Sequence, residues 1–215
     1  AAPREDAENL GMVVNAILAA RVSDSDSPFR GGFHLVYDRV AASYRVPHWI
    51  WAWGPAMRLL LEASQYLPDS QHLNEAAHAA GRTSLGFFID DPKHMAHDIS
   101  TVRWYAALGT PAGAIQYASL ADSLFMAGWG WIPLYRATGD QRYAEATWRL
   151  VNKADQLLKE YTIPPQDYVF ECENWTPHTL DESGFGMVGF EELFAVTSEI
   201  RVREIGTLFM DRHLD

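Results

Sequence analysis

The amino-acid sequence predicts an all-α fold made of repeated helical hairpins. Two observations predict it: a 17-residue, mainly apolar segment occurs three times, and an amphipathic segment with helical periodicity follows each copy. Patterns typical of β-strands are sparse, and the clearest of them, at residues 31–46, predicts only a short hairpin.

The three apolar segments align without gaps, at intervals of 74 and 59 residues. They read HWIWAWGPAMRLLLEAS from His48, DSLFMAGWGWIPLYRAT from Asp122 and DESGFGMVGFEELFAVT from Asp181. Because these segments are apolar nearly all round, each is expected to form a helix that is covered on every side. We therefore predict inner helices near 48–64, 122–138 and 181–197.

The segment after each inner helix carries charged residues on one side and apolar residues on the other. This pattern is typical of a helix that lies at the surface with one face on the core. The predicted outer helices lie near 71–88, 140–161 and 199–213. Residues 5–22 show the same pattern and predict one more outer helix.

Inner helices packed side by side, with outer helices behind them, form a curved double layer. Such a layer closes into an α/α toroid when enough hairpins are present. Residues 1–215 supply about three and a half helix pairs, which we interpret as a single repeat domain. Because a closed barrel of six pairs needs a longer chain, we expect the sequence to be part of a full barrel.

The bulk composition excludes two classes of partner. The net charge of −11 argues against nucleic acid, and no run of 18 or more apolar residues could span a membrane. Cys172 is the only cysteine and cannot form an internal disulfide. His94 and His97 have HxxH spacing but no third ligand beside them, so we predict neither a metal nor a cofactor.

Asp122 and Asp181 occupy the same repeat position, at the start of two inner helices. Aspartate is a favoured N-cap, worth ~1 kcal/mol, so capping is the alternative to catalysis. However, the long connections 90–120 and 164–180 enter these helix starts, and such connections are usually functional. Two carboxylates that face one cavity suit glycoside hydrolysis. We therefore predict that both aspartates are catalytic.

The end of the helical array at which these inner helices begin is called the mouth below. It is predicted to hold an oligosaccharide, because tryptophans that can stack on sugar rings are plentiful near the helix starts. The candidate substrate-binding residues are His48, Trp49, Trp51, Trp129, Trp131, Trp175 and His178. For each tryptophan the alternative is a place in the core. Glu171 and Glu173 lie in one of the long connections that enter the helix starts, and they are alternative candidates for the catalytic acid.

The segment LADSLFMAGWGWIPLYRATGDQRYAEA resembles the inner-helix, turn and outer-helix unit of six-hairpin glycosidases. These α/α-barrel enzymes include the unsaturated glucuronyl hydrolases and the unsaturated rhamnogalacturonyl hydrolases. In the former, two aspartates begin successive inner helices about one repeat apart, after an aromatic-rich helix. Asp122, Asp181 and the segment HWIWAWGPAM look like these elements in the same order, and the resemblance covers Val46 to His213.

The resemblance implies a hydrolase of oligosaccharides that contain uronic acid, and hence an anionic substrate. It implies that Asp181 is the general acid/base, which protonates carbon 4 of a 4,5-unsaturated uronic acid and activates water to attack carbon 5. Asp122 would be the second aspartate, which positions or polarises the reacting groups.

Three features depart from the family pattern. His48–Trp49 replaces the expected motif, Glu182–Ser183–Gly184 follows Asp181, and the second half of a barrel is absent. A hydrolase of saturated glucuronides or a lyase on the same scaffold is therefore an alternative. A sugar epimerase is another, with His48 or His178 transferring the proton. A non-catalytic scaffold that binds glycan or protein would instead bury both aspartates as caps.

Overall fold

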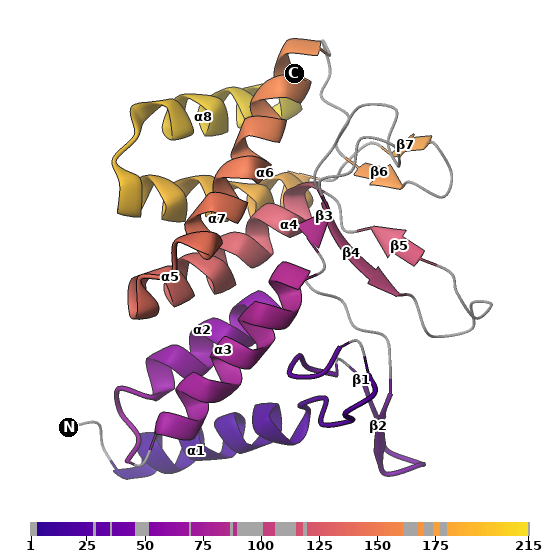
Figure 1. Ribbon diagram of the computed structural model, residues 1–215, viewed down its shortest axis with the longest axis vertical. Helices are drawn as coiled ribbons and strands as arrows, with labels where there is room; N and C mark the ends of the chain where they lie inside the picture. Colours follow the sequence, from indigo (N-terminus) through magenta and orange to yellow (C-terminus); the bar gives the residue numbers. More distant parts are fainter. Residues whose placement is uncertain are drawn as a thin grey trace.

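In the computed structural model the protein is mostly helical, and its helices follow one another as hairpins (Figure 1). The structure describes residues 4–27, 29–34, 36–45, 52–68, 70–86, 88–89, 101–105, 115–117, 120–160, 167–169, 174–176 and 180–214. The helices are α1 (Arg4–Ala19), α2 (Trp53–Ala63), α3 (Gln71–Gly86), α4 (Leu120–Met126), α5 (Ile132–Thr138), α6 (Gln141–Glu160), α7 (Leu180–Thr197) and α8 (Ile200–Leu214), and a π-helical turn, η3 (Ala127–Trp131), joins α4 to α5. The predicted all-α class is confirmed.

The inner layer comprises α2, the continuous helix α4–η3–α5, and α7. Helix α7 packs along α4 and η3, and α2 packs against η3 and α5. The sequence repeat aligns Leu60, Leu134 and Leu193, and each of them is fully buried, with 0% of its surface exposed. The gapless alignment therefore describes one structural repeat.

The outer layer comprises α3, α6 and α8, each of which follows its inner helix after a short turn (Figure 1). One column of the repeat is buried in all three outer helices and holds Leu73, Tyr143 and Val202. The column two residues further on is exposed and holds Glu75, Glu145 and Glu204. Each outer helix thus has one face on the core and one in solvent, as its amphipathic pattern predicted. None of the described helices is long and apolar enough to cross a membrane.

The turn between α5 and α6 is closed by the side chain of Thr138. Its hydroxyl donates to the Leu134 carbonyl at 2.7 Å and accepts a hydrogen bond from the backbone N–H of Asp140 at 3.1 Å. Gly139, between them, takes the left-handed conformation with φ of 71°. A left-handed residue just past a helix end is a common way to stop a helix, and glycine adopts it without steric cost.

The turn between α7 and α8 repeats this arrangement in atomic detail. The Thr197 hydroxyl donates to the Leu193 carbonyl at 2.9 Å and accepts from the N–H of Glu199 at 3.3 Å. Ser198 takes the left-handed place of the glycine, with φ of 57°. The hydroxyl-bearing residue that ends both sequence copies is therefore the residue that closes both turns.

Replacing Ser198 by Gly should raise the free energy of unfolding by about 0.5 kcal/mol. An L-residue pays at least about 1 kcal/mol in the left-handed region, and glycine loses part of that gain through its greater freedom in the unfolded chain. Urea denaturation would measure the change. The reverse substitution in the matching turn, Gly139→Ser, should lower stability; a destabilised Ser198→Gly variant would contradict the interpretation of this turn.

Glycines allow the inner helices to approach closely. A Cβ atom on Gly128 would lie 2.6 Å from the Val188 carbonyl oxygen of α7, and a Cβ on Gly189 would lie 2.6 Å from the Leu124 carbonyl oxygen of α4. Gly130 of η3 lies against Met57 and Gly54 of α2 in the same way. These contacts make tight helix packing the reason for three of the inner-helix glycines.

Short antiparallel strands accompany the helices. The hairpin predicted at 31–46 is confirmed as β1 (Val36–Asp38) paired with β2 (Ser43–Arg45). The connections 90–120 and 164–180, in which no strand was predicted, contain strands. These are β4 (Thr101–Tyr105) and β5 (Ile115–Tyr117), which join β3 (Phe88–Ile89) in one sheet, and the pair β6 (Asp167–Val169) and β7 (Asn174–Thr176). Figure 1 shows β3–β7 together on one side of the helices, and α4 contacts both β4 and β6.

Candidate functional site

Asp122 and Asp181 lie in the first turns of two inner helices that pack against each other. Asp122 is the third residue of α4 and Asp181 is the second residue of α7. Both helices begin on the side of the molecule where β3–β7 gather (Figure 1). The structure describes the backbone of both aspartates, and their side chains lie outside the described part. The two helix starts that the repeat placed in register are therefore neighbours in space.

The helix starts also bear on the alternative that these aspartates are caps. The helices begin at Leu120 and Leu180, so each aspartate is inside the first turn rather than at the N-cap position before it. A carboxylate in the first turn still interacts favourably with the helix dipole, by about 0.3–1 kcal/mol. The expected contribution of each aspartate to stability is therefore that of a charge near a helix end, without an N-cap hydrogen bond.

Helical periodicity places an aromatic pair on the face of the inner helix that carries Asp122. Phe125 follows Asp122 by three residues within α4, and such a step lies on one helix face. Trp129 follows Phe125 by four residues, inside the π-helical turn η3. The Phe125 and Trp129 rings are 5.1 Å apart between centroids, at an interplanar angle of 33°. Phe125 is buried, whereas Trp129 is partly exposed. An aromatic surface is thus accessible on the same face as one of the candidate acids.

A shared carboxylate fixes this face across three inner helices. The Arg58 guanidinium of α2 lies over the Trp129 ring, 5.5 Å from its centroid, and donates to Glu192 of α7 at 3.0 Å. Arg136 of α5 pairs with the second oxygen of the Glu192 carboxylate at 2.6 Å. A hydrogen bond to Glu62 raises the pKa of Arg58 above its ordinary value, and the charge of Glu192 raises it further. Cation–π and ionic contacts therefore hold Trp129 in position.

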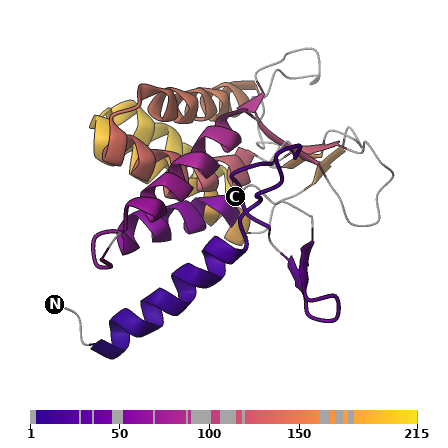
Figure 2. The ribbon, with the colours of Figure 1, turned by 60° about the horizontal axis from the view of Figure 1, so that its bottom comes forward.

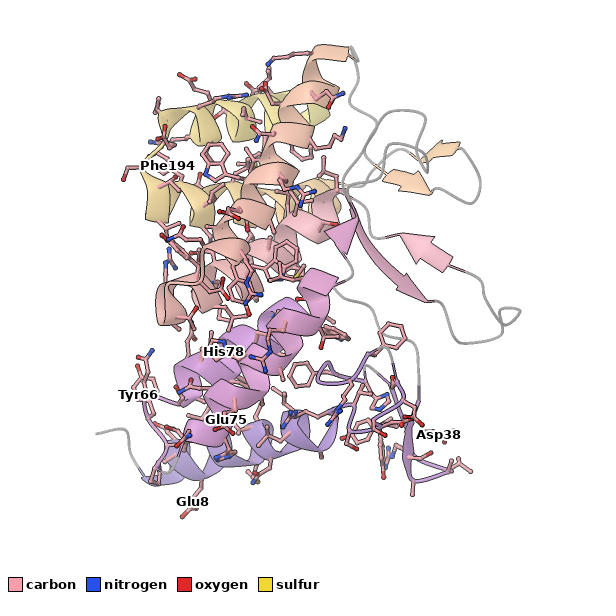
Figure 3. The ribbon with its side chains drawn as sticks, in the orientation of Figure 1. Glu8, Asp38, Tyr66, Glu75, His78 and Phe194 are labelled. Atoms are coloured by element: carbon pink, nitrogen blue, oxygen red, sulfur yellow. The ribbon has the colours of Figure 1, made fainter. Side chains whose placement is uncertain are left out.

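A cavity of about 500 Å³ lies at the opposite end of the inner helices, beside the C-terminal ends of α2 and α5. Its lining includes Arg58, Glu62, Asn74, His78, Pro133 and Arg136. His78 lies on α3 (Figure 3), where burial lowers its pKa below the ordinary value and the charge of Arg82 lowers it further. This cavity is remote from the first turns of α4 and α7, so we do not assign the acid/base chemistry to it.

Trp131 belongs to the core and not to the mouth, which corrects its prediction as a substrate-binding residue. Its side chain is fully buried, and its indole Nε1 donates to the Ser84 hydroxyl of α3 at 2.8 Å. The neighbouring indole of Trp129, two positions earlier, is partly exposed on the other side of the helix. Of these two tryptophans, Trp131 therefore packs against the outer layer and Trp129 faces the inner surface.

Several other candidates lie outside the residues that the structure describes. They are His48, Trp49, Trp51, His178, the alternative acids Glu171 and Glu173, the HxxH pair His94 and His97, and Cys172. Trp175 lies in β7 opposite Tyr168, and its side chain is also outside the described part. Within the described ranges, no group of three or more His, Cys, Asp or Glu residues is arranged to hold a metal ion.

Sequence reasoning missed the cluster formed by Arg58, Arg136 and Glu192. A signal for it was present, because these charged residues interrupt helices that are otherwise apolar nearly all round. A charge inside such a helix is expected to be paired. The sequence does not say which charges pair, since the partners are 134 residues apart in the case of Arg58 and Glu192.

The comparisons with known proteins bear on the fold. No known protein family matches the sequence, and none of the curated proteins matches it. Among solved structures, the chain is similar to a selenomethionine derivative of the GH76 alpha-mannanase of Bacteroides thetaiotaomicron. The match has a TM-score of 0.69 at 15% sequence identity and covers 97% of this chain and 54% of that chain. This chain therefore spans about half the length of that structure.

The similarity shows the architecture. The chain has the helical-hairpin fold of an α/α barrel, as the repeat predicted, and it corresponds to part of the barrel of that mannanase. The helical-hairpin fold that the resemblance implied is confirmed, and the unsaturated glucuronyl hydrolase assignment stays a prediction. A shared fold does not fix the substrate, because function depends on the site that a fold carries.

Proposed function

We propose that this chain carries the acid/base residues of a glycoside hydrolase, with an oligosaccharide bound across the N-terminal ends of α4 and α7. The observation that carries the proposal is the placement of Asp122 and Asp181 in the first turns of two inner helices that pack together. Most glycoside hydrolases use a pair of carboxylates that flank the bond to be cleaved. The α/α-barrel fold shared with an alpha-mannanase supports the same class of reaction.

The proposed roles follow from the chemistry of the two carboxyl groups. Asp181 donates a proton to the substrate and then accepts one from the attacking water, while Asp122 positions that water and influences the protonation of its neighbour. Trp129 offers its exposed surface to a sugar ring. On an unsaturated uronide, the proton goes to carbon 4 and water to carbon 5, and the product opens to release the next sugar.

For the substrate, we propose an oligosaccharide that ends in an unsaturated uronic acid. The support is the order of the aromatic-rich segment, Asp122 and Asp181 along the chain, which is that of unsaturated glucuronyl hydrolases. An α-mannoside is the second candidate, because the solved structure to which this chain is similar is a mannanase. These two substrates differ in charge and in the presence of a double bond, so one set of assays separates them.

The test is a panel of unsaturated uronide disaccharides, saturated uronide disaccharides and α-linked manno-oligosaccharides. Loss of the ultraviolet absorbance of the double bond would report hydration of the first group, and new reducing ends would report hydrolysis of the others. We expect turnover of the unsaturated uronides. Hydrolysis of mannosides alone would replace the uronide proposal, and no turnover of any member would count against a glycosidase.

Replacing Trp129 by Ala should weaken substrate binding about tenfold, or about 1.4 kcal/mol of binding free energy. The free energy of unfolding should fall by less than this, because the indole is partly exposed. The matched control is Trp131→Ala, which removes a fully buried indole and should cost about 3–5 kcal/mol of stability. Steady-state kinetics and denaturation of both variants measure the two effects. If Trp129→Ala loses stability and binding to the same extent, Trp129 has a purely structural role.

A further inference from the structure

We propose that the cavity between the C-terminal ends of α1 and α3 binds an oxyanion group of an acidic glycan, such as a uronate carboxylate or a sulfate ester. The identification of the ligand as a glycan rests on the proposed function. The cavity has a volume of about 680 Å³ and is lined by Arg21, Arg30 and Arg82 together with Ser23, Ala79 and Thr83. This volume lies in the range of small-molecule binding sites.

The charge of this cavity is opposite to that of the protein as a whole. The chain has a net charge of −11, yet the described residues that line the cavity include three arginines and no carboxylate. Within the described part of the chain, none of these arginines forms an ion pair, whereas Arg58, Arg136, Arg142 and Arg201 all do. Three neighbouring cations that no described carboxylate neutralises repel one another, so an anion bound between them would be stabilised.

The side chain of Arg21 provides a second indication that the cavity binds an anion. Its Nε atom is buried and has no hydrogen-bond partner among the described residues. A buried donor without an acceptor costs free energy and calls for a physical explanation. Guanidinium groups bind carboxylate and sulfate oxygens through paired N–H donors, which makes an oxyanion the fitting acceptor.

The backbone around the cavity holds two of the arginines in place. Arg21 forms an antiparallel bridge with Phe33, and the N–H of Gly31 donates to the Val22 carbonyl at 3.0 Å. The carbonyl of Arg30 accepts a hydrogen bond from the Thr83 hydroxyl of α3 at 2.6 Å. The loop that carries Arg30 is therefore fixed to the helix that carries Arg82, and binding does not need to order it.

The cavity lies at the same end of the helical array as the helix starts. Figure 2 shows α1 leading directly into the loop that carries Arg30. The Phe33 carbonyl in this loop accepts a hydrogen bond at 2.9 Å from Nε1 of Trp53, the first residue of α2. Gly32 lies directly against the Trp53 ring. A glycan held at the mouth could therefore place a charged substituent in this cavity, one layer behind the inner helices.

The test measures binding, which does not require turnover. Isothermal titration calorimetry of the unchanged protein would use a galacturonic acid trisaccharide, a 6-sulfated galactose disaccharide, inorganic phosphate and a neutral galactose disaccharide. Ionic strength is kept constant with sodium chloride, because screening alone changes weak ionic binding. The variants are Arg30→Gln and Arg82→Gln, both at exposed residues, and the matched control is Arg203→Gln. Arg203 is on α8, 5.7 Å from the centroid of the Phe194 ring, and Phe194 lies far from α1 in Figure 3. The control therefore changes the net charge equally, at a place away from the cavity.

We expect one saturable site for an acidic saccharide, weakened at least tenfold in Arg30→Gln and Arg82→Gln and unchanged in Arg203→Gln. A preference for the carboxylated or the sulfated saccharide identifies the group that the site takes. The proposal is overturned by absence of saturable binding, by equal weakening in Arg203→Gln, or by binding of phosphate without either acidic saccharide. Retained binding in a protein that hydrolyses no member of the activity panel would refute the proposed hydrolase and leave this site standing.

Discussion

Replacing Asp181 by Asn should lower the turnover of the best substrate by ~10²–10⁴, the usual contribution of general acid–base catalysis. The amide has almost the shape of the carboxyl group but cannot donate and accept a proton in the same way. The position of Asp181 in the first turn of α7 limits the expected effect on the fold, because a first-turn charge contributes about 0.3–1 kcal/mol. Stopped assays give the turnover, and urea denaturation gives the stability.

The matched variant is Asp122→Asn, in the first turn of α4. If Asp122 only positions water and influences the protonation of Asp181, the turnover of Asp122→Asn should fall less than that of Asp181→Asn. If Asp122 influences the protonation of Asp181, as proposed, the pH–rate profile should also change shape in Asp122→Asn, because two interacting carboxyl groups titrate as a coupled pair. Near-full activity of Asp181→Asn would exclude Asp181 as the proton donor. Asp122, Glu171 and Glu173 would then be the acids to test.

The second large effect is expected from Gly189→Ala, which should lower the free energy of unfolding by about 1–3 kcal/mol. The added methyl group would lie 2.6 Å from the Leu124 carbonyl oxygen and 2.9 Å from the Leu124 Cβ. Because the oxygen belongs to the backbone of α4, the two inner helices must move apart to make room. Thermal and urea denaturation would measure the loss.

Gly184→Ala is the control for this variant, since it lies on the same helix, α7. Apart from its chain neighbours and the backbone of its own helix, no described atom lies within 4 Å of a Cβ built on Gly184, and the residue is exposed. Alanine is the better helix former by about 0.8–1 kcal/mol, so Gly184→Ala should be as stable as the parent or more stable. If both variants lose stability equally, the loss in Gly189→Ala does not come from the contact between α7 and α4.

The sequence predicted the helices well because the repeat and the hydrophobic pattern agree. The buried column Leu60, Leu134 and Leu193 marks the inner helices, and the exposed glutamates mark the outer ones. The strands β5, β6 and β7 were missed because each is only three residues long, as in IQY and DYV. Runs this short carry too little alternation to be distinguished from loop sequence.

For the candidate residues, the sequence predicted the helix starts at which they lie, and their catalytic roles stay predictions. The repeat placed Asp122 and Asp181 at the starts of neighbouring helices, and the structure confirms those helix starts. The sequence could not decide between Trp129 and Trp131, because the decision depends on Ser84 of a different hairpin, which accepts the Trp131 hydrogen bond. The π-helical turn at Ala127–Trp131 adds a local change of periodicity that a regular helical pattern does not contain.

The two ends of the helical array differ in how the chain connects its elements. At one end, Thr138 and Thr197 close turns of a few residues with the same pair of hydrogen bonds. At the other end, residues 87–119 and 161–179 join an outer helix to the next inner one. Evolution can lengthen, shorten or exchange these longer segments while the capped turns and the glycine contacts stay the same. Under the proposed function, changes in these segments would therefore alter which sugar is recognised while the hairpin fold is kept.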